Sequence, residues 1–395
     1  MGETVSTRDA GTTHRTASDR PAATSLRTRA RIAHVIPTLR VAWLENVVLR
    51  LTDQFRAGFE HVVITPSGDG PLRTRFPEGV SVVAMAERHR PDRWNAVRMA
   101  RLFRALRPDV VHSRNWSCVD AILGARLAGV AVVIHGEHGR EAVDPEGHNP
   151  LRKRLRRLMV PLVTLFVTVS RDLARWLVED VSIPARKVTI IWNGVDTRRF
   201  DGRDRQEARR ALAIPDGVIA AGTVGRLDPV KDQIGLLRAF ARIADDPRAL
   251  LLIVGDAPCR REIETSVASL GLEGRVRLLG EREDVPRVLA GLDVFVLSSL
   301  GEGISNTILE ALATGLPVVA TRVGGNPELV VDRSTRPPRS SEALAAALKH
   351  CLDEPALAAR HGRAGRARAE TQFSLDRMVA AYGALYARLL QTTAP

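Results

Sequence analysis

Short apolar segments alternate with helical segments along most of this chain of 395 residues, and the alternation occurs in two successive series. The apolar segments are rich in valine, isoleucine and leucine and are bounded by glycine, proline, asparagine or aspartate, which is typical of buried strands. Strands that alternate with helices form parallel sheets with helices on both faces. The pattern therefore predicts the α/β class, with two doubly wound, Rossmann-like domains that face each other across a cleft.

The first series of expected strands covers residues 32–39, 61–66, 80–85, 108–113, 130–136, 164–170 and 187–196. The second series covers 218–227, 249–256, 275–280, 293–299 and 317–323. The expected helices cover 43–55, 94–106, 119–128, a segment that ends at 240, 260–270, 284–292, 304–314, 342–351, 356–371 and 374–390.

These elements divide the chain into four parts. Residues 1–30 are rich in Thr, Ser, Arg and Ala, with almost no large apolar side chain, and this composition predicts a disordered tail. An N-terminal domain is expected over 31–196 and a C-terminal domain over 197–373. The remaining segment, 374–395, is expected to be a helix that packs back on the N-terminal domain.

Composition restricts the classes of function. The formal net charge of +13 favours anionic partners, namely nucleic acid, a phosphorylated small molecule or an anionic membrane, although a solvated arginine-rich surface would give the same charge. The basic residues are scattered and no nucleic-acid motif occurs, so we expect no nucleic-acid partner. No G-x-G-x-x-G follows a strand, which argues against a dinucleotide-dependent oxidoreductase. Three well-separated cysteines, no long apolar segment and no signal-peptide core predict a cytoplasmic protein.

Two cations follow the first strand of the second series, in the segment GRLDPVKD. Arg226 and Lys231 are expected at the carboxyl end of that strand, before a helix. Arginine binds a diphosphate through its forked guanidinium and lysine binds it as a point charge. Two solvated surface cations are the alternative interpretation of this pair.

The segment EGISNTILEALATGLPVVATRVGGNPELV, residues 302–330, contains a second group of candidate residues. Ser305 and Asn306 are good N-cap residues for the helix that follows. The backbone amides of Gly303, Ile304 and Ser305 would then lie at a helix N-terminus, where they attract phosphate. This end of the helix is therefore a candidate diphosphate site.

Two glutamates in the same segment are candidates for binding sugar hydroxyls. Glu302 precedes the expected helix and Glu310 lies on its second turn, which separates them by roughly 10–12 Å at ~1.5 Å per helical residue. That separation is similar to the distance between the ribose and the hexose of a sugar nucleotide. A carboxylate accepts two hydrogen bonds from a vicinal diol. The alternatives are a loop carboxylate for Glu302 and an exposed helix residue for Glu310.

Taken together, GRLDPVKD, IVGD and the segment 302–330 resemble the retaining glycosyltransferases of family 4, which have the GT-B fold. The E-x7-E pattern of that family corresponds to Glu302 and Glu310. HVIPTL, HGEHGR, VTVSRDLARWL and WNGVDTRRF in the first half match as well, so the resemblance extends from about residue 32 to residue 330. It is strongest to members of bacterial exopolysaccharide clusters.

The resemblance implies a hexosyltransferase that uses a UDP- or GDP-linked sugar as substrate, with no metal and no cofactor. It implies transfer with retention to a lipid- or saccharide-linked acceptor held by the N-terminal domain, in exopolysaccharide or cell-envelope glycan synthesis. By position, Arg226 and Lys231 would hold the diphosphate and stabilise the leaving group. Glu310 would bind the ribose and Glu302 would contact the donor sugar. His138, rather than His135, would lie near the sugar, and Glu137 and Arg140 would line the acceptor side.

The sequence departs from the family pattern at two places. Ala42 and Trp43 replace two glycines after the first strand, where glycine would allow a close backbone approach. The segment DRSTRPPRSSEAL, residues 332–344, lacks a recognisable strand. These departures leave a second hypothesis open, a catalytically impaired homologue that acts as a scaffold in a polysaccharide assembly complex.

The segment LRKRLRRLMVPLV, residues 151–163, places leucines at helical spacing among five cations. A basic amphipathic helix of this kind can lie on an anionic membrane. The alternative is a surface helix that packs on its own domain. We therefore expect possible peripheral association with the inner face of the membrane.

Overall fold

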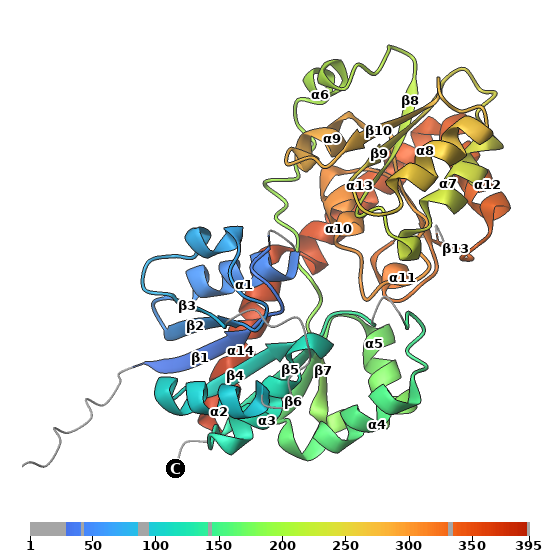
Figure 1. Cartoon of the computed structure of the whole chain (residues 1–395). Coiled ribbons are helices and arrows are strands. Elements are labelled where there is room, and N and C mark those ends of the chain that lie inside the picture. Colours follow the sequence, from blue (N-terminus) through green and yellow to red (C-terminus); the bar gives the residue numbers. More distant parts are fainter. Residues whose placement is uncertain (1–28, 41–42, 86–94, 141–143, 331–334, 393–395) are drawn as a thin grey trace, which may run out of the picture.

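The computed structural model describes residues 29–40, 43–85, 95–140, 144–330 and 335–392. These residues form two domains, each built on a sheet in which every strand pair is parallel (Figure 1). The first sheet has the order β3-β2-β1-β4-β5-β6-β7 and the second has the order β10-β9-β8-β11-β12-β13. The order reverses beside β1 and beside β8, which is the doubly wound arrangement. The predicted fold class is confirmed.

The strands of the first sheet are β1 (Ala30–Val35), β2 (Phe59–Thr65), β3 (Ser81–Ala84), β4 (Val110–Arg114), β5 (Val132–Glu137), β6 (Leu165–Thr168) and β7 (Val188–Ile190). Those of the second are β8 (Ile219–Val224), β9 (Ala249–Val254), β10 (Val276–Gly280), β11 (Val294–Leu297), β12 (Val318–Thr321) and β13 (Thr335–Arg336). The helices are α1 (Trp43–Gln54), α2 (Asn95–Leu106), α3 (Asp120–Leu127), α4 (Pro150–Met159), α5 (Arg171–Arg175), α6 (Arg205–Ala211), α7 (Gln233–Ala241), α8 (Arg260–Ser269), α9 (Val285–Gly291), α10 (Asn306–Thr314), α11 (Asn326–Leu329), α12 (Ser341–Asp353), α13 (Pro355–Gln372) and α14 (Leu375–Gln391).

The central strands are buried on both faces because helices cover both. Every residue of β4, β5 and β9 is buried. Alternate residues of β1 illustrate the two faces: Ile32 packs with α1 and α14, whereas Ala33 packs with α2 and α3. This double burial explains why the strands are continuous apolar runs rather than alternating ones.

The last helix returns to the first domain. Figure 1 shows α14 beside the first sheet, away from the second domain. Side chains of α14, among them Tyr382, Tyr386 and Leu389, share a buried cluster with Ile32 and Val110 of that sheet. The chain therefore passes between the domains twice, once after β7 and once before α14.

These two passages are joined by backbone hydrogen bonds. The N–H of Val195 donates to the carbonyl of Phe373 at 2.8 Å, and the N–H of Leu375 donates to the carbonyl of Val195 at 2.9 Å. A Cβ on Gly194 would lie 2.7 Å from the Cα of Leu375, so only glycine allows the passages to come this close.

One prediction about the second sheet is wrong. A strand does follow the segment 302–330: Thr335 and Arg336 form β13, which pairs with Ala320 and Thr321 of β12. It has only two residues and lies among arginines and prolines, so it gives no recognisable strand pattern in the sequence. Ala42 and the tail at 1–28 lie outside the described residues, as does the side chain of Trp43, which begins α1.

None of the helices among the described residues is long and apolar enough to cross a bilayer. Three short helices, α5, α6 and α11, are absent from the elements expected from the sequence. Each has seven residues or fewer. Helices this short give little periodic signal.

Candidate active site

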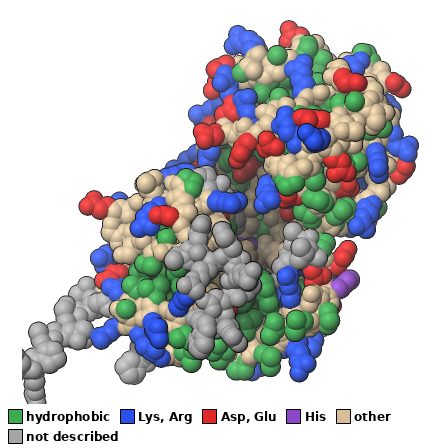
Figure 2. All heavy atoms as spheres, viewed as in Figure 1, with side chains coloured by type: hydrophobic (Ala, Val, Ile, Leu, Met, Phe, Trp, Pro, Cys, Tyr) green, Lys and Arg blue, Asp and Glu red, His purple; other side chains and the backbone are tan. Residues whose placement is uncertain are grey.

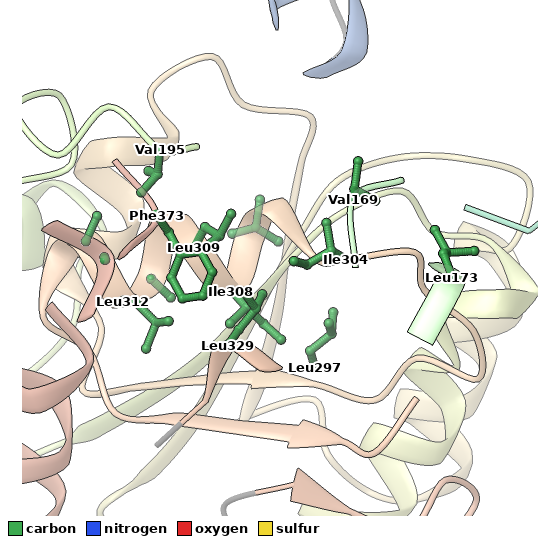
Figure 3. Close-up of a cluster of buried hydrophobic side chains, with 14 of the residues drawn as sticks. Val169, Leu173, Val195, Leu297, Ile304, Ile308, Leu309, Leu312, Leu329 and Phe373 are labelled. Atoms are coloured by element: carbon green, nitrogen blue, oxygen red, sulfur yellow. The ribbon is translucent and has the colours of Figure 1, made fainter. Parts of the chain in front are cut away.

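The N-terminus of α10 is built as its sequence predicts. The hydroxyl of Ser305 accepts a hydrogen bond from the N–H of Ile308 at 3.2 Å, which confirms Ser305 as the N-cap. Asn306 is the first residue of α10, and its side-chain oxygen accepts a hydrogen bond from Asn193 at 2.8 Å. Ile304 is 4% exposed and shares a buried cluster with Val169 and Leu173 of the first domain (Figure 3). These contacts fix the end of the helix against the neighbouring domain.

A pocket of about 510 Å³ lies where the two domains meet. Figure 2 shows the hollow between the domains on one face of the molecule. The pocket brings together four residues predicted to act on the sugar donor or acceptor and one glycine of the α10 loop. The lining comprises Asn115, Trp116, Ser117, His138, Gly139, Arg140 and Pro145 of the first domain, and Val230, Lys231, Gly301, Glu302 and Gly303 of the second.

Lys231 and Glu302 form an ion pair in this pocket. Lys231 ends the 3-10 turn η6 (Pro229–Lys231), which follows β8, and its Nζ lies 2.5 Å from Oε1 of Glu302. The same carboxylate oxygen accepts a hydrogen bond from the Ser299 hydroxyl at 2.7 Å. The backbone carbonyl of Lys231 is held by the Ser298 hydroxyl at 2.8 Å. Both charged side chains are therefore fixed, and each neutralises the other.

Arg226 does not line the pocket. Its side chain is 74% exposed, and its Nε lies 3.0 Å from Asp228 of the same turn. Its backbone carbonyl accepts a hydrogen bond from Gln233 at 2.9 Å, which fixes the turn but leaves the guanidinium in solvent. The structure thus places Arg226 and Lys231 on one turn after β8 but brings only Lys231 to Glu302.

Glu310 is a half-buried residue on the second turn of α10. Burial raises the pKa of its carboxyl group to about 7, although the positive charge of Arg199 opposes the shift. Among the described residues, no donor makes a hydrogen bond to this carboxylate. A hydrogen-bond donor at this carboxylate would stabilise its charged form and lower its pKa.

His138 lies in the loop after β5 and lines the pocket. Its backbone N–H donates to Oδ1 of Asn115 at 3.0 Å. Burial and the charge of Arg114 lower the pKa of the imidazole to about 3, against the opposing effect of Glu137. The ring is therefore neutral near pH 7. His135, the competing histidine, is fully buried and contacts the hydroxyl of Ser113 at 2.8 Å.

The two other predicted acceptor residues differ in position. Glu137 is 1% exposed, and its Oε1 lies 2.7 Å from Nε of Arg156. Burial would raise the pKa of Glu137, but hydrogen bonding from His135 and the charge of Arg156 outweigh burial and lower it to about 2. Glu137 therefore lies behind the pocket wall as an ionised structural group. Arg140 does line the pocket, where its Nη1 lies 2.9 Å from Asp172.

Sequence reasoning missed a buried basic group behind His138. Arg114, at the end of β4, has no solvent exposure. Its Nη2 lies 3.2 Å from Nδ1 of His112, and that nitrogen lies 2.9 Å from the hydroxyl of Tyr386 on α14. Nη1 lies 3.4 Å from Nδ1 of His34. The available signal was the polar end of this strand, where His112, Ser113 and Arg114 follow two valines.

The described residues contain no candidate metal site. Among the described residues, no group of three or more His, Cys, Asp or Glu side chains is placed to hold a metal ion. A reaction without a metal stays a prediction.

Two family models match the chain. The model described as Glycosyltransferase Family 4 matches residues 44–199, and the model described as Glycosyl transferases group 1 matches residues 219–354. The first covers most of the N-terminal domain, and the second includes Lys231, Glu302 and Glu310.

Named relatives with similar sequences are bacterial transferases and synthases. The chain is 30% identical, over 60% of its length, to the Escherichia coli UDP-Gal:alpha-D-GlcNAc-diphosphoundecaprenol alpha-1,3-galactosyltransferase. The match covers 64% of that enzyme, so the chain spans less than two thirds of this relative's own length. It is 27% identical to the Bacillus anthracis N-acetyl-alpha-D-glucosaminyl L-malate synthase, over 71% of this chain and 74% of that protein.

Solved structures show the same fold. The Anabaena protein HepE in complex with UDP and glucose has a TM-score of 0.79 at 21% identity, covering 91% of this chain and 100% of that chain. A sucrose-phosphate synthase from Thermosynechococcus elongatus has a TM-score of 0.81 at 22% identity, covering 92% and 100%.

The raised pKa of Glu310 leads to a prediction about stability. Its ordinary value is 4.5 and its folded value is about 7, so the folded state binds the proton more tightly than the unfolded state does. The resulting destabilisation is absent at low pH, grows as pH rises from 4.5, and is complete above 7. Glu310→Gln should therefore stabilise the protein by about 2 kcal/mol more at pH 8 than at pH 5.

Urea denaturation of the unaltered protein and of Glu310→Gln, each at pH 5 and at pH 8, measures this difference in stability. Glu273→Gln, at an exposed residue, is the matched control, and it should change the free energy of unfolding by the same amount at both pH values. Equal effects of Glu310→Gln at pH 5 and pH 8 would mean that the Glu310 carboxyl group titrates normally.

Proposed function

Because this chain belongs to the glycosyltransferases of family 4, we propose that it moves a hexose from a UDP- or GDP-linked donor to a lipid- or saccharide-linked acceptor. We place the reaction in the synthesis of exopolysaccharide or of another cell-envelope glycan. The observation that carries the proposal is the interdomain pocket, in which Lys231 and Glu302 of one domain meet His138 of the other. The nucleotide sugar is a substrate, and the proposal includes no cofactor, no metal and no nucleic-acid partner.

The donor diphosphate would bind where Lys231 and the α10 N-terminus lie. In the free protein the charge of Lys231 is neutralised by Glu302. A diphosphate carries more negative charge than one carboxylate, so it would take over Lys231 and leave Glu302 to accept hydrogen bonds from sugar hydroxyls. Arg226, exposed on the same turn, would supply a second cation once the diphosphate is present.

The nucleoside would extend along α10 to Glu310. A ribose diol would give the carboxylate of Glu310 the hydrogen-bond donors that it lacks among the described residues, and this would lower its raised pKa. The neutral imidazole of His138 would approach the sugar from the first domain. In the retaining step that we propose, the leaving diphosphate accepts the proton of the attacking hydroxyl on the same face of the sugar. Stabilisation of the charge on that leaving group would be the main catalytic contribution.

The acceptor would enter from the first domain. Two of the relatives are named as acting on diphosphoundecaprenol acceptors, which carry a long apolar chain. In this chain a larger groove of about 1500 Å³ adjoins the pocket and shares Trp116 and Ser117 with it. Its wall includes Leu155 and Leu158 of α4 and Leu123 of α3, which suits an apolar tail.

The orientation of α4 supports contact with a membrane. Leu151, Leu155 and Leu158 are 64%, 38% and 64% exposed, whereas the guanidinium of Arg156 is buried against Glu137. A surface helix normally turns its apolar stripe toward its own core. We propose that the exposed leucines of α4, within the segment 151–163, lie on an anionic membrane surface, which would make the protein cytoplasmic and peripheral to the inner face.

A nucleotide-binding screen tests the donor. UDP, GDP, ADP and their sugar conjugates would be added to the purified protein and to Glu310→Ala and Lys231→Ala, and thermal stability would be measured. Binding adds stability that grows with the ratio of free ligand to Kd. We expect a rise with one nucleotide that is reduced in both variants. The absence of a rise with every nucleotide would favour the scaffold hypothesis.

Lys231→Ala tests catalysis. Turnover should fall by roughly 10²-fold, because that is the scale of losing one group that stabilises developing charge. Lys349→Ala removes an exposed lysine that pairs with Asp353 on α12, and it should leave turnover unchanged. Radiolabelled sugar transfer, once the screen has named the nucleotide, measures both. Turnover of Lys231→Ala close to that of the unaltered protein would exclude the proposed role.

Leu151→Ser combined with Leu158→Ser tests membrane contact. Both leucines are exposed, so the free energy of unfolding should change little. Because each leucine loses its burial in lipid, binding to vesicles that contain phosphatidylglycerol should weaken by roughly tenfold or more. Co-sedimentation measures the bound fraction. Leu270→Ser, at an exposed leucine of the second domain, is the control, and equal binding by both variants would exclude α4 as the contact.

A further inference from the structure

Glu328, on the short helix α11, makes three hydrogen bonds to the other domain. Its Oε1 accepts the backbone N–H of Asp172 at 3.0 Å. Its Oε2 accepts the backbone N–H of Arg171 at 3.0 Å and the indole N–H of Trp192 at 3.0 Å. One side chain of the second domain thus holds three donors of the first, which are 136 to 157 residues away in the sequence.

Two of these donors lie at the start of α5, and Trp192 lies two residues after the end of β7. Ser170, the N-cap of α5, already accepts the N–H of Leu173 through its hydroxyl. The N–H groups of Arg171 and Asp172 have no partner within α5, because the first N–H groups of a helix never do. Glu328 therefore completes the capping of a helix that belongs to the other domain.

The backbone around Glu328 is fixed on its own side as well. Its carbonyl accepts Nη2 of Arg368 on α13 at 2.8 Å. The Arg368 guanidinium lies over the ring of Phe373, which meets Trp192 edge-on at 6.3 Å between ring centroids. The carboxylate is therefore presented to the first domain from a rigid support.

A short chain of contacts connects Glu328 to the pocket. Gly325, three residues earlier, donates its N–H to the carbonyl of Gly303 at 3.0 Å. Gly303 lies so close to the first domain that a Cβ on it would be 2.1 Å from the carbonyl oxygen of His138. The loop that carries Glu328 is therefore hydrogen-bonded to the loop that carries Gly303. The contacts of Glu328 and the close approach of Gly303 to His138 are connected in this way.

We propose that Glu328 is the positioning residue that sets the approach of the two domains, and thereby places Lys231 and Glu302 opposite His138. Its carboxylate has no place in the pocket and would act only through the loop 324–328. The effect on turnover rests on the proposed transferase function, whereas the effect on domain arrangement does not.

Three variants separate positioning from mere stability. Glu328→Ala removes all three hydrogen bonds. Glu328→Gln keeps the size of the side chain and one acceptor oxygen, so it should restore part of the interaction. Trp192→Phe removes a single donor from the opposite domain and retains an aromatic ring against Phe373. Glu273→Ala, at an exposed residue of the second domain, is the control.

Hydrogen–deuterium exchange and small-angle X-ray scattering measure the domain contact without any substrate. In Glu328→Ala the amides of Arg171 and Asp172 should exchange roughly tenfold faster or more, as expected when a hydrogen bond to a charged group is lost. The radius of gyration should rise because the domains separate. Glu328→Gln and Trp192→Phe should show smaller changes in the same direction, and Glu273→Ala should show none.

Kinetics supply the readout that a purely structural role would not change. The nucleotide site lies within the second domain, so the Kd for the nucleotide should stay within about twofold, as for independent sites. Turnover should fall by roughly tenfold to 10²-fold, because the groups on the two domains lose their alignment. Faster exchange at Arg171 and Asp172 with unchanged scattering and turnover would overturn the proposal, since Glu328 would then be a helix cap alone. If the unaltered protein neither binds nucleotides nor transfers sugar, the proposed function fails, and exchange and scattering still decide the role of Glu328.

Discussion

The close approach of two backbone loops, one from each domain, is the constraint on which the site depends. A Cβ on Gly303 would lie 2.1 Å from the carbonyl oxygen of His138, a distance that no side chain could occupy. On the other side of the loop, a Cβ on Gly324 would lie 1.8 Å from the carbonyl oxygen of Glu302. Glycine at these positions allows the backbone amides and the carboxylate of Glu302 to reach the interdomain pocket.

Charge inside the pocket is balanced before any substrate arrives. Lys231 is matched by Glu302, and His138 is held neutral by burial and by Arg114 behind it. Two further features of the second domain stand out, the 74% exposed guanidinium of Arg226, which pairs with Asp228 of its own turn, and the raised pKa of Glu310. Both lie in the second domain, so a ligand that bears an anion and a diol would be recognised first by that domain. The first domain contributes the neutral imidazole of His138 and the ion pair between Arg140 and Asp172 to the pocket.

The sequence predicts the architecture well because doubly buried strands leave long apolar runs. It also predicts the capping of α10, since Ser305 acts on a residue only three positions later. It does not predict the contacts of Glu328, or that between Arg114 and His34, because these partners lie far away in the chain and carry no local signature. The orientation of α4 is a similar case. Its leucine stripe is visible in the sequence, but the burial of Arg156 against Glu137 turns that stripe outward, and the pair is apparent only in three dimensions.

Contacts of two kinds join the two domains, backbone hydrogen bonds and side-chain contacts. At one end the passages at Val195 and Leu375 are tied by backbone hydrogen bonds, which any rotation of the domains must preserve or bend. Elsewhere the contact is made by side chains, among them Ile304, Asn306 and Glu328, and the hydrogen bonds of Glu328 can break and form again without strain in the chain. The backbone hydrogen bonds at Val195 are therefore where we expect a hinge between the domains. The side-chain hydrogen bonds of Glu328 are where we expect the domains to separate. Any separation of the domains around Val195 would therefore have to break the Glu328 contacts, and their return would restore the approach of Gly303 to His138.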